Sequence, residues 1–325
     1  MKSTDKKVAL SGVQPTGKPH IGNYFGAMKQ FVDSQEEFDL YVFIAEYHAM
    51  TTVQNKDELA NQIKNLILDY LGIGLDPEKM TLYRQSDIPE LTELTWMFNC
   101  LVTVPWLERA HAFKDKSEKG IEASVGLFNY PVLMAADILL PGAEVVPVGK
   151  DQVQHVEMTR EIARKFNNIY GDTFTEPQEL VKESVATVPG TDGQKMSKSY
   201  GNTIPLFGTD KEIKKAIMGI VTDSKNPDEP KNPDECNVFA IHKLITPEPQ
   251  LSEVRKGYLE GGLGYGDSKK ILLENYLNFI TPMRERRKYY EDNPGIVRQI
   301  LDEGKTKIQN RVRPFMKEIR EKVGL

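Results

Sequence analysis

A chain of 325 residues, 39% hydrophobic and 27% charged, has ordinary globular composition and is long enough for one large domain and a smaller one. Its two cysteines are too few for a four-cysteine zinc or iron–sulfur site and fit a reducing compartment, so we predict no metal ligand set. A net charge of −5 argues against general affinity for nucleic acid. Without a signal-peptide pattern or an apolar run of roughly 20 residues, we expect a cytoplasmic protein that does not enter a membrane.

Strand-like and helix-like runs alternate in the first half of the sequence. Four apolar runs predict strands, at Val8–Val13, Leu40–Ala45, Met80–Tyr83 and Glu144–Val148. This alternation is typical of a parallel sheet with helices on both faces, and ligands of such sheets bind at the carboxyl ends of the strands. The predicted fold class is therefore α/β, with a Rossmann-like, doubly wound parallel sheet.

One helical pattern between these runs is especially clear. Its apolar side chains recur at the spacing of a single helix face: Leu59, Ile63, Leu66, Ile67, Tyr70 and Leu71. Asp57 lies where a helix N-cap is expected, and Gly72 and Gly74 follow as stop signals. We therefore predict a helix from about residue 57 to about residue 72.

A turn-rich segment links the first strand to the first helix-like run. Residues Ser11–Tyr24 read SGVQPTGKPHIGNY. A helix N-terminus offers unpaired N–H groups and the positive end of a dipole, which suits a phosphate. His20 can donate a hydrogen bond to a phosphoryl oxygen, and Gly22 allows a flat base or ribose to approach the backbone. On these residues alone, a tight loop without a binding function is the alternative.

An apolar helix-like stretch, Tyr130–Ile138, carries a single acidic side chain. Tyr130, Met134 and Asp137 follow an i, i+4, i+7 spacing and share one helix face. A buried carboxylate needs a donor, and an indole N–H is a donor without acceptor ability. Asp137 is thus a candidate to hold an indole ring, the alternative being a local cap or ion pair.

A second glycine-rich segment carries two lysines. Residues Gly190–Asn202 read GTDGQKMSKSYGN, so Lys195 and Lys198 are three residues apart. Lysine is a compact point charge with three donors, and such a pair can close on a pyrophosphate. Glycines on both sides could act as hinges. The alternative is a charged surface loop.

Strand signals fade after about Gly201, and helical patterns follow. We therefore predict a catalytic domain at residues 1–203 and a helical domain at residues 204–325. The stretch Thr281–Leu325 contains 12 Lys and Arg against 7 Asp and Glu. This excess suggests a local anion-binding surface, and helices with a solvated, mixed-charge face are the alternative.

These segments together resemble the signatures of the class I aminoacyl-tRNA synthetases. HIGN at His20–Asn23 resembles the HIGH signature, with the final Asn typical of the tryptophanyl branch, and Lys195–Ser199 is identical to the KMSKS signature. The YPVLMAADI segment is similar to a helix of that branch. The resemblance extends over essentially the whole chain. It implies activation of L-tryptophan by ATP with Mg²⁺, transfer to the 3′-terminal ribose of tRNA(Trp), and a homodimer.

The same resemblance implies roles for particular residues. The catalytic groups are His20, Lys195 and Lys198. The implied ATP-binding residues are Gln14, Pro15, Thr16, Gly22, Asn23, Gly149, Lys150, Asp151, Lys195, Met196, Ser197, Lys198 and Ser199. The implied tryptophan-binding residues are Asp137, Tyr130, Met134, Gln152, His48, Val146 and Val148. Gln152 and His48 would face the ammonium and carboxylate, and residues 204–325 would bind the anticodon, with the last helix packing back on the catalytic domain.

Some positions depart from the pattern of the tryptophanyl branch. Leu10 stands where several relatives have Phe, Glu46 replaces a commoner Asp, and Gln194 replaces a Lys often found before the KMSKS signature.

Three other functions compete with tryptophan activation. Asn23 and Met134 argue against a tyrosyl-type ligase, and intact His20, Lys195 and Lys198 argue against a catalytically silent synthetase-like binding protein. The KMSKS signature and the basic end disfavour a small-molecule nucleotidyltransferase such as a pantothenate-synthetase-like ligase.

Overall fold

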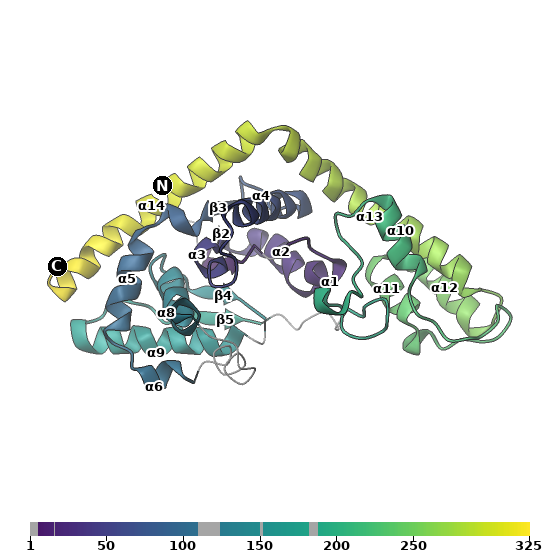
Figure 1. Ribbon diagram of the computed structural model, residues 1–325, viewed down its shortest axis with the longest axis horizontal. Helices are drawn as coiled ribbons and strands as arrows, with labels where there is room; N and C mark the ends of the chain where they lie inside the picture. Colours follow the sequence, from purple (N-terminus) through teal and green to yellow (C-terminus); the bar gives the residue numbers. More distant parts are fainter. Residues whose placement is uncertain (1–5, 16, 110–123, 150–151, 182–187) are drawn as a thin grey trace.

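A five-stranded parallel sheet lies at the centre of the larger part of the molecule (Figure 1). The computed structural model describes residues 6–15, 17–109, 124–149, 152–181 and 188–325. The strands run in the order β3-β2-β1-β4-β5. Their bounds are β1 Val8–Val13, β2 Asp39–Ile44, β3 Met80–Arg84, β4 Val145–Pro147 and β5 Gln178–Leu180. The α/β prediction is confirmed.

The central strands are almost fully buried, as strands covered on both faces must be. β1 and β2 pair in register from Val8↔Asp39 to Val13↔Ile44. All four predicted strands are present, with ends that differ by at most a residue or so. The fifth, β5, was not predicted because it is three residues long, partly exposed and carries no apolar run. Strand order reverses between β1 and β4, so their carboxyl ends border the crevice where such sheets bind ligands.

Helices cover the sheet and connect its strands. The helical segments before residue 204 are α1 Ile21–Asn23, the π-helical turn η1 Tyr24–Met28, α2 Lys29–Glu37, α3 Glu46–Ala49, α4 Lys56–Ile73, η2 Gln85–Asp87, α5 Glu90–Asn99, α6 Val104–Leu107, α8 Val125–Leu139, α9 Val153–Tyr170 and η4 Lys198–Tyr200. None of the helices among the described residues is long and apolar enough to cross a membrane.

The predicted amphipathic helix is α4, but its start differs from the prediction. Asn55, not Asp57, is the N-cap, because the Asn55 side chain accepts hydrogen bonds from the backbone N–H groups of Asp57 and Glu58. The helix ends at Ile73, and the C-cap Gly74 has a φ of 110°, which is left-handed and favours glycine. Gly72 is inside the helix.

The part of the chain after residue 204 is built from helices in the described structure. They are α10 Asp210–Met218, η5 Pro233–Glu235, α11 Asn237–Ile245, α12 Glu248–Leu259, α13 Tyr265–Asp292 and α14 Pro294–Val323. The two longest, α13 and α14, form a bent arch that extends from the helical part across the sheet-containing part (Figure 1). α13 packs against α4, and α14 packs against β3 and α5.

The last helix covers an edge strand of the sheet. Gly304 makes this possible, because a Cβ atom there would lie 1.8 Å from the carbonyl oxygen of Leu82 in β3. An uncovered edge strand invites pairing with other chains, so α14 also protects the sheet. Gln309 adds a hydrogen bond from its side-chain amide to the carbonyl of Asp87 at 2.7 Å.

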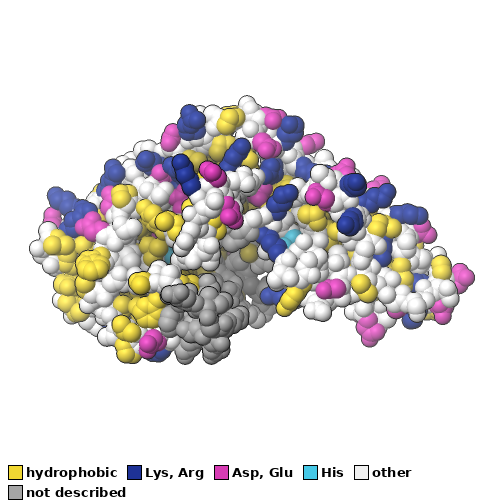
Figure 2. All heavy atoms as spheres, viewed as in Figure 1, with side chains coloured by type: hydrophobic (Ala, Val, Ile, Leu, Met, Phe, Trp, Pro, Cys, Tyr) yellow, Lys and Arg dark blue, Asp and Glu magenta, His cyan; other side chains and the backbone are white. Residues whose placement is uncertain are grey.

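The basic residues of the C-terminal stretch are largely engaged within the protein. Arg313 and Arg320 on α14 pair with Glu90 and Glu93 of α5. The other cations with an ion pair or hydrogen bond are Arg284, Arg286, Arg287, Lys288, Lys305, Lys307, Arg311, Lys317 and Lys322. Figure 2 shows basic and acidic side chains interspersed along this upper edge. Much of the excess positive charge therefore attaches the arch to the body and is shared with neighbouring carboxylates.

Candidate active site

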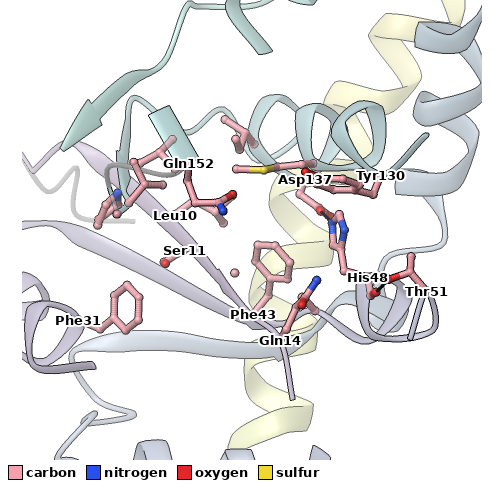
Figure 3. Close-up of a pocket in the computed structure, with 18 of the residues that line it drawn as sticks. Leu10, Ser11, Gln14, Phe31, Phe43, His48, Thr51, Tyr130, Asp137 and Gln152 are labelled. Atoms are coloured by element: carbon pink, nitrogen blue, oxygen red, sulfur yellow. Dashed lines mark hydrogen bonds and ion pairs between the residues drawn. The ribbon is translucent and has the colours of Figure 1, made fainter. Parts of the chain in front are cut away.

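A cavity of about 470 Å³ opens at the switch point between β1 and β4. The seven residues predicted to bind tryptophan all line it: His48, Tyr130, Met134, Asp137, Val146, Val148 and Gln152. Gln14 and Gly149, predicted for ATP, line it as well. Figure 3 shows His48 of α3, Tyr130 and Asp137 of α8, and Gln152 in the turn before α9 around the carboxyl end of β1. The sheet topology therefore gathers residues from distant parts of the sequence into one concave site.

The walls of the cavity are mostly apolar. Leu10 and Phe43 contribute from β1 and β2, Val146 and Val148 from β4 and the residue following it, and Met134 from α8. Leu10, which departs from the Phe of several relatives, thus faces the cavity. An apolar cavity of this kind suits an aromatic ring.

Asp137 is the acidic side chain among the described residues that line this cavity, and it is only 2% exposed. His48 Nε2 lies 2.9 Å from Asp137 Oδ2, so the imidazole N–H donates to the carboxylate (Figure 3). The Gln85 amide donates to both carboxylate oxygens at 2.9 Å. Burial raises the pKa of Asp137, and the hydrogen bonds from His48 and Gln85 act in the opposite direction. Fixed donors therefore orient the carboxylate while its further lone pairs can face the cavity.

Gln85 was not predicted from the sequence. It is fully buried and comes directly after β3, at the carboxyl end of a strand, which is the one signal that marks it. The side-chain carbonyl oxygen of Gln85 accepts a hydrogen bond from the backbone N–H of Tyr47 at 2.9 Å, so the side-chain NH₂ group must face Asp137. Glu46 supports the same turn, because its carboxylate accepts from the N–H of Ser86 at 3.1 Å.

His48 lines the cavity and contacts its acid. The resemblance implies that His48 faces the ammonium and carboxylate of the substrate together with Gln152, and this stays a prediction. In the structure, the His48 ring donates to Asp137, which also accepts from Gln85. His48 therefore belongs to the group that orients the acid.

A chain of hydrogen bonds lies at another side of the cavity. Tyr130 Oη is 2.5 Å from His155 Nε2, and His155 Nδ1 is 3.0 Å from Gln152 Oε1. Tyr130 and Gln152 line the cavity, whereas His155 lies behind them on α9 and is 3% exposed. His155 was not predicted from the sequence, although it lies three residues after Gln152, nearly one helical turn along.

A second cavity, of about 450 Å³, adjoins the first. Gly12, Gln14 and Phe31 line both cavities, so the two meet at the carboxyl end of β1. Asn23 and Lys198 line the second cavity only. It therefore brings the histidine turn and the lysine loop to one place.

His20 caps the helix that begins the histidine turn. Its Nδ1 accepts from the backbone N–H of Asn23 at 3.2 Å, and the Asn23 side chain accepts from the N–H of His20 at 3.1 Å. Burial, and then the charge of Lys198, lower the pKa of His20 to about 4. With Nδ1 accepting, the proton of the neutral ring is on Nε2, which is thus a donor.

Gly22 is required here for a reason the sequence did not reveal. A Cβ atom at this position would lie 2.9 Å from the His20 ring and 3.3 Å from the side chain of Met196. These two side chains lie on the side of Gly22 where a Cβ atom would point. The glycine therefore lets the buried Met196 of the lysine loop pack on the histidine turn.

Backbone hydrogen bonds also tie the two motifs together. The N–H of Ile21 donates to the carbonyl of Ile204 at 3.0 Å, and the N–H of Leu206 donates to the carbonyl of Pro19 at 3.1 Å. These contacts join the start of α1 to the segment that directly follows the lysine loop. The signatures are thus neighbours in space although they are far apart in the sequence.

Asn202 holds the lysine loop in shape and was not predicted. Its side chain is 2% exposed and accepts from the N–H of Ser197 at 2.8 Å. Its amide group donates to the carboxylate of Asp192 and to the carbonyl of Lys195. Gly190 allows this packing, because a Cβ atom there would lie 2.2 Å from the Asn202 amide.

The two lysines have different surroundings. Partial burial lowers the pKa of Lys198, and the nearby carboxylate of Asp69 acts in the opposite direction. Lys195 is exposed and, unlike Lys198, is not among the residues that line the two cavities. In this conformation, Lys198 is the lysine that meets the second cavity.

Asp69 of α4 is a further residue that the sequence did not indicate. It lines the second cavity, and burial raises its pKa to about 6, against the effects of Arg287 and Lys198. Arg287 on α13 donates to it at 2.7 Å. The second cavity is therefore linked by an ion pair to the arch of the helical part.

Some of the remaining predicted residues are described by the structure, and others are not. Pro15 is buried in the turn, and the hydroxyls of Ser197 and Ser199 are 2.8 Å apart on the loop. Thr16, Lys150 and Asp151 lie outside the described residues.

Comparisons with known proteins identify the family of this chain. The sequence profile of the family described as tRNA synthetases class I (W and Y) matches residues 2–280. The tryptophan–tRNA ligase of Fusobacterium nucleatum is 49% identical over 320 residues, which cover 98% of each chain. That of Rhodopirellula baltica is 46% identical over 97% of this chain and 99% of its own.

Solved structures give the same result. The crystal structure of tryptophanyl-tRNA synthetase from Campylobacter jejuni, complexed with ADP and tryptophan, aligns with a TM-score of 0.93 and 47% identity. The alignment covers 98% of this chain and all of that chain. A match of this extent in sequence and in structure goes well beyond a shared fold. The chain belongs to the class I tRNA synthetases of the tryptophan and tyrosine family, on its tryptophan branch.

Proposed function

We propose that this protein activates L-tryptophan with ATP and transfers the tryptophanyl group to the 3′-terminal ribose of tRNA(Trp). One observation carries the proposal: a buried, hydrogen-bonded acid lies in an apolar cavity that adjoins a second cavity bordered by the histidine turn and Lys198. The first cavity suits an aromatic amino acid and the second a phosphate group. The near-identical architecture of tryptophan–tRNA ligases supports this assignment.

The acid selects the indole ring. Asp137 receives N–H groups from His48 and Gln85, and a carboxylate has lone pairs for another donor. An indole N–H supplies that donor, whereas an aromatic ring without one leaves a buried acceptor unpaired. Discrimination of this kind is strong without a separate editing step. We assign Met134, Val146 and Val148 to the faces of the ring.

The reaction itself requires little proton transfer. The tryptophan carboxylate is ionised at pH 7 and attacks the α-phosphate, which releases pyrophosphate. Catalysis then depends on positioning and on stabilising charge at the phosphate oxygens. His20 donates through Nε2, and Lys198 and Lys195 add positive charge from the loop. The 2′-hydroxyl of the terminal ribose then takes the aminoacyl group.

ATP brings Mg²⁺ with it. Asp69 is the carboxylate among the described residues that line the second cavity. Its carboxylate already accepts a hydrogen bond from the guanidinium of Arg287. These residues fit a cation that is held mainly by phosphate oxygens, as is usual for Mg²⁺. The ion would neutralise charge on the leaving pyrophosphate.

We further propose a homodimer in the cytoplasm. Large apolar side chains are exposed on the neighbouring helices α5, α6 and α8, namely Trp96, Val104 and Val125. Exposed apolar groups that lie on adjacent elements suit a second protein surface. We assign the anticodon contacts to the helical part after residue 204.

The test is ATP–pyrophosphate exchange measured with each proteinogenic amino acid, followed by charging of tRNA(Trp) with tRNA(Tyr) as the control. We expect exchange with tryptophan at least about 100-fold faster than with tyrosine or phenylalanine, since each lacks an indole N–H. Equal or faster exchange with tyrosine would indicate the tyrosyl-type alternative. Tryptophan binding without exchange would indicate a silent binding protein.

A further inference from the structure

A buried histidine behind the tryptophan cavity connects two residues that line it. His155 is 3% exposed and contacts Tyr130 through Nε2 at 2.5 Å and Gln152 through Nδ1 at 3.0 Å. Tyr130 and Gln152 are both part of the cavity wall (Figure 3). His155 is not among the residues that line the cavity, so it acts on a ligand only through these two neighbours.

The chemistry of the three groups determines the direction of both hydrogen bonds. Gln152 meets the imidazole with its carbonyl oxygen, which can only accept, so His155 Nδ1 must donate. When the imidazole is neutral it has only one N–H, and Nε2 then accepts from the Tyr130 hydroxyl. The order is therefore Tyr130 O–H to His155 Nε2, and His155 Nδ1–H to Gln152 Oε1.

This order changes what both oxygens can offer to a ligand. The Tyr130 hydroxyl uses its single O–H to donate to His155 Nε2, so toward any other group its oxygen acts as an acceptor. The Gln152 carbonyl oxygen is an acceptor by nature, and the N–H of His155 fixes its orientation. Two acceptors on one cavity wall favour a group with several N–H donors and a positive charge.

We propose that His155 is a positioning residue that makes this wall specific for the α-ammonium group of the substrate. The inference rests on the proposed function, since it names the part of tryptophan that meets Tyr130 and Gln152. The indole end and the ammonium end of the cavity then have the same kind of arrangement. In each, a buried histidine orients polar side chains that face the ligand: His48 at Asp137, and His155 at Tyr130 and Gln152.

Four ligands separate this role from a general structural one. Dissociation constants are measured by calorimetry for L-tryptophan and tryptamine, which have an ammonium group, and for indole-3-propionate and 3-methylindole, which have none. For His155→Phe, which keeps a ring of similar size, we expect affinity for the first two to fall roughly 10-fold, the effect of one or two hydrogen bonds. The other two ligands should change by less than about 2-fold.

A rescue variant and a matched control complete the experiment. In His155→Gln, the side-chain carbonyl oxygen reaches about the position of Nε2 and can accept a hydrogen bond from the Tyr130 hydroxyl. Tryptamine affinity should therefore recover in part. Thr159→Val removes a fully buried hydroxyl one turn along the same helix and should leave all four affinities unchanged.

Two results would overturn the proposal. One is an equal loss of affinity for all four ligands in His155→Phe, and the other is the same ammonium-dependent loss in Thr159→Val. Failure of the wild-type protein to bind tryptophan would instead contradict the proposed function, so the two failures are distinguishable.

Discussion

The two ends of the candidate active site are built by different means. At the indole end, Asp137 is 2% exposed and held by donors from two other elements, within walls made of strands and α8. The phosphate end is the second cavity with the histidine turn and the lysine loop beside it. There the proposed functional groups lie on turns and loops, and Lys195 is exposed. One end is a buried pocket whose polar groups have hydrogen-bond partners, and the other is a charged surface held by a few buried residues such as Asn202 and Met196.

The difference reflects what each end has to do. Selecting an amino acid requires polar groups that cannot adapt to the wrong ligand, and burial with fixed partners provides this. Stabilising a phosphate during transfer requires positive charge that can follow the group, which exposed lysines on a loop provide. Substitutions at the indole end should therefore change substrate binding, and substitutions at the phosphate end should change the rate.

The largest expected effect is at the phosphate end. Lys195→Ala should lower kcat in pyrophosphate exchange by about 100- to 1,000-fold, the usual cost of removing a group that stabilises developing charge. The KM for tryptophan should stay within about 2-fold of the wild-type value. Lys214→Ala, on an exposed lysine of α10, is the control and should leave both parameters unchanged. A rise in the tryptophan KM as large as the fall in kcat would contradict the division between the two ends.

A smaller effect is expected at the indole end. Asp137→Asn keeps the shape of the side chain but leaves one oxygen to accept from His48, Gln85 and the indole N–H, so at least one of them loses its partner. We expect the KM for tryptophan to rise about 10- to 100-fold while the KM for ATP is unchanged.

The control for this substitution is Asp267→Asn, a change at an exposed residue of the helical part. It should leave both KM values at the wild-type level. An ATP KM that rises in Asp137→Asn together with the tryptophan KM would show that the two ends are not separable.

The smallest effect concerns the pH dependence of stability. The pKa of His20 is lowered to about 4 from its ordinary 6.5, so between these values the unfolded chain binds more protons than the folded one. Stability contributed by His20 is therefore lost as the pH falls. His20→Asn keeps an N-cap and removes this titration.

Relative to His20→Asn, the wild-type protein should lose about 1 kcal/mol of unfolding free energy between pH 7 and 5.5, measured by urea denaturation. The raised pKa of Asp69 acts in the opposite direction but is present in both proteins, so it largely cancels in the difference. Parallel pH profiles for the two proteins would show that His20 is not held neutral by the fold.

The sequence by itself determined the features that are local in the chain. Four of the strands follow from apolar runs, and the predicted helix α4 follows from its periodicity, because burial of one face imposes a short repeat. The seven residues that the resemblance implies for tryptophan line one cavity, because parallel strands bring their carboxyl ends to one edge.

Only the tertiary structure decided which groups orient these residues. Gln85 is 52 residues from Asp137, and Arg287 is 218 residues from Asp69, so no local pattern relates either pair. The basic end illustrates the same limit, since composition showed an excess of positive charge but not the carboxylates of α5 that pair with Arg313 and Arg320. Hydrogen bonds and ion pairs depend on which surfaces pack together, and that is settled by the whole fold rather than by any one segment.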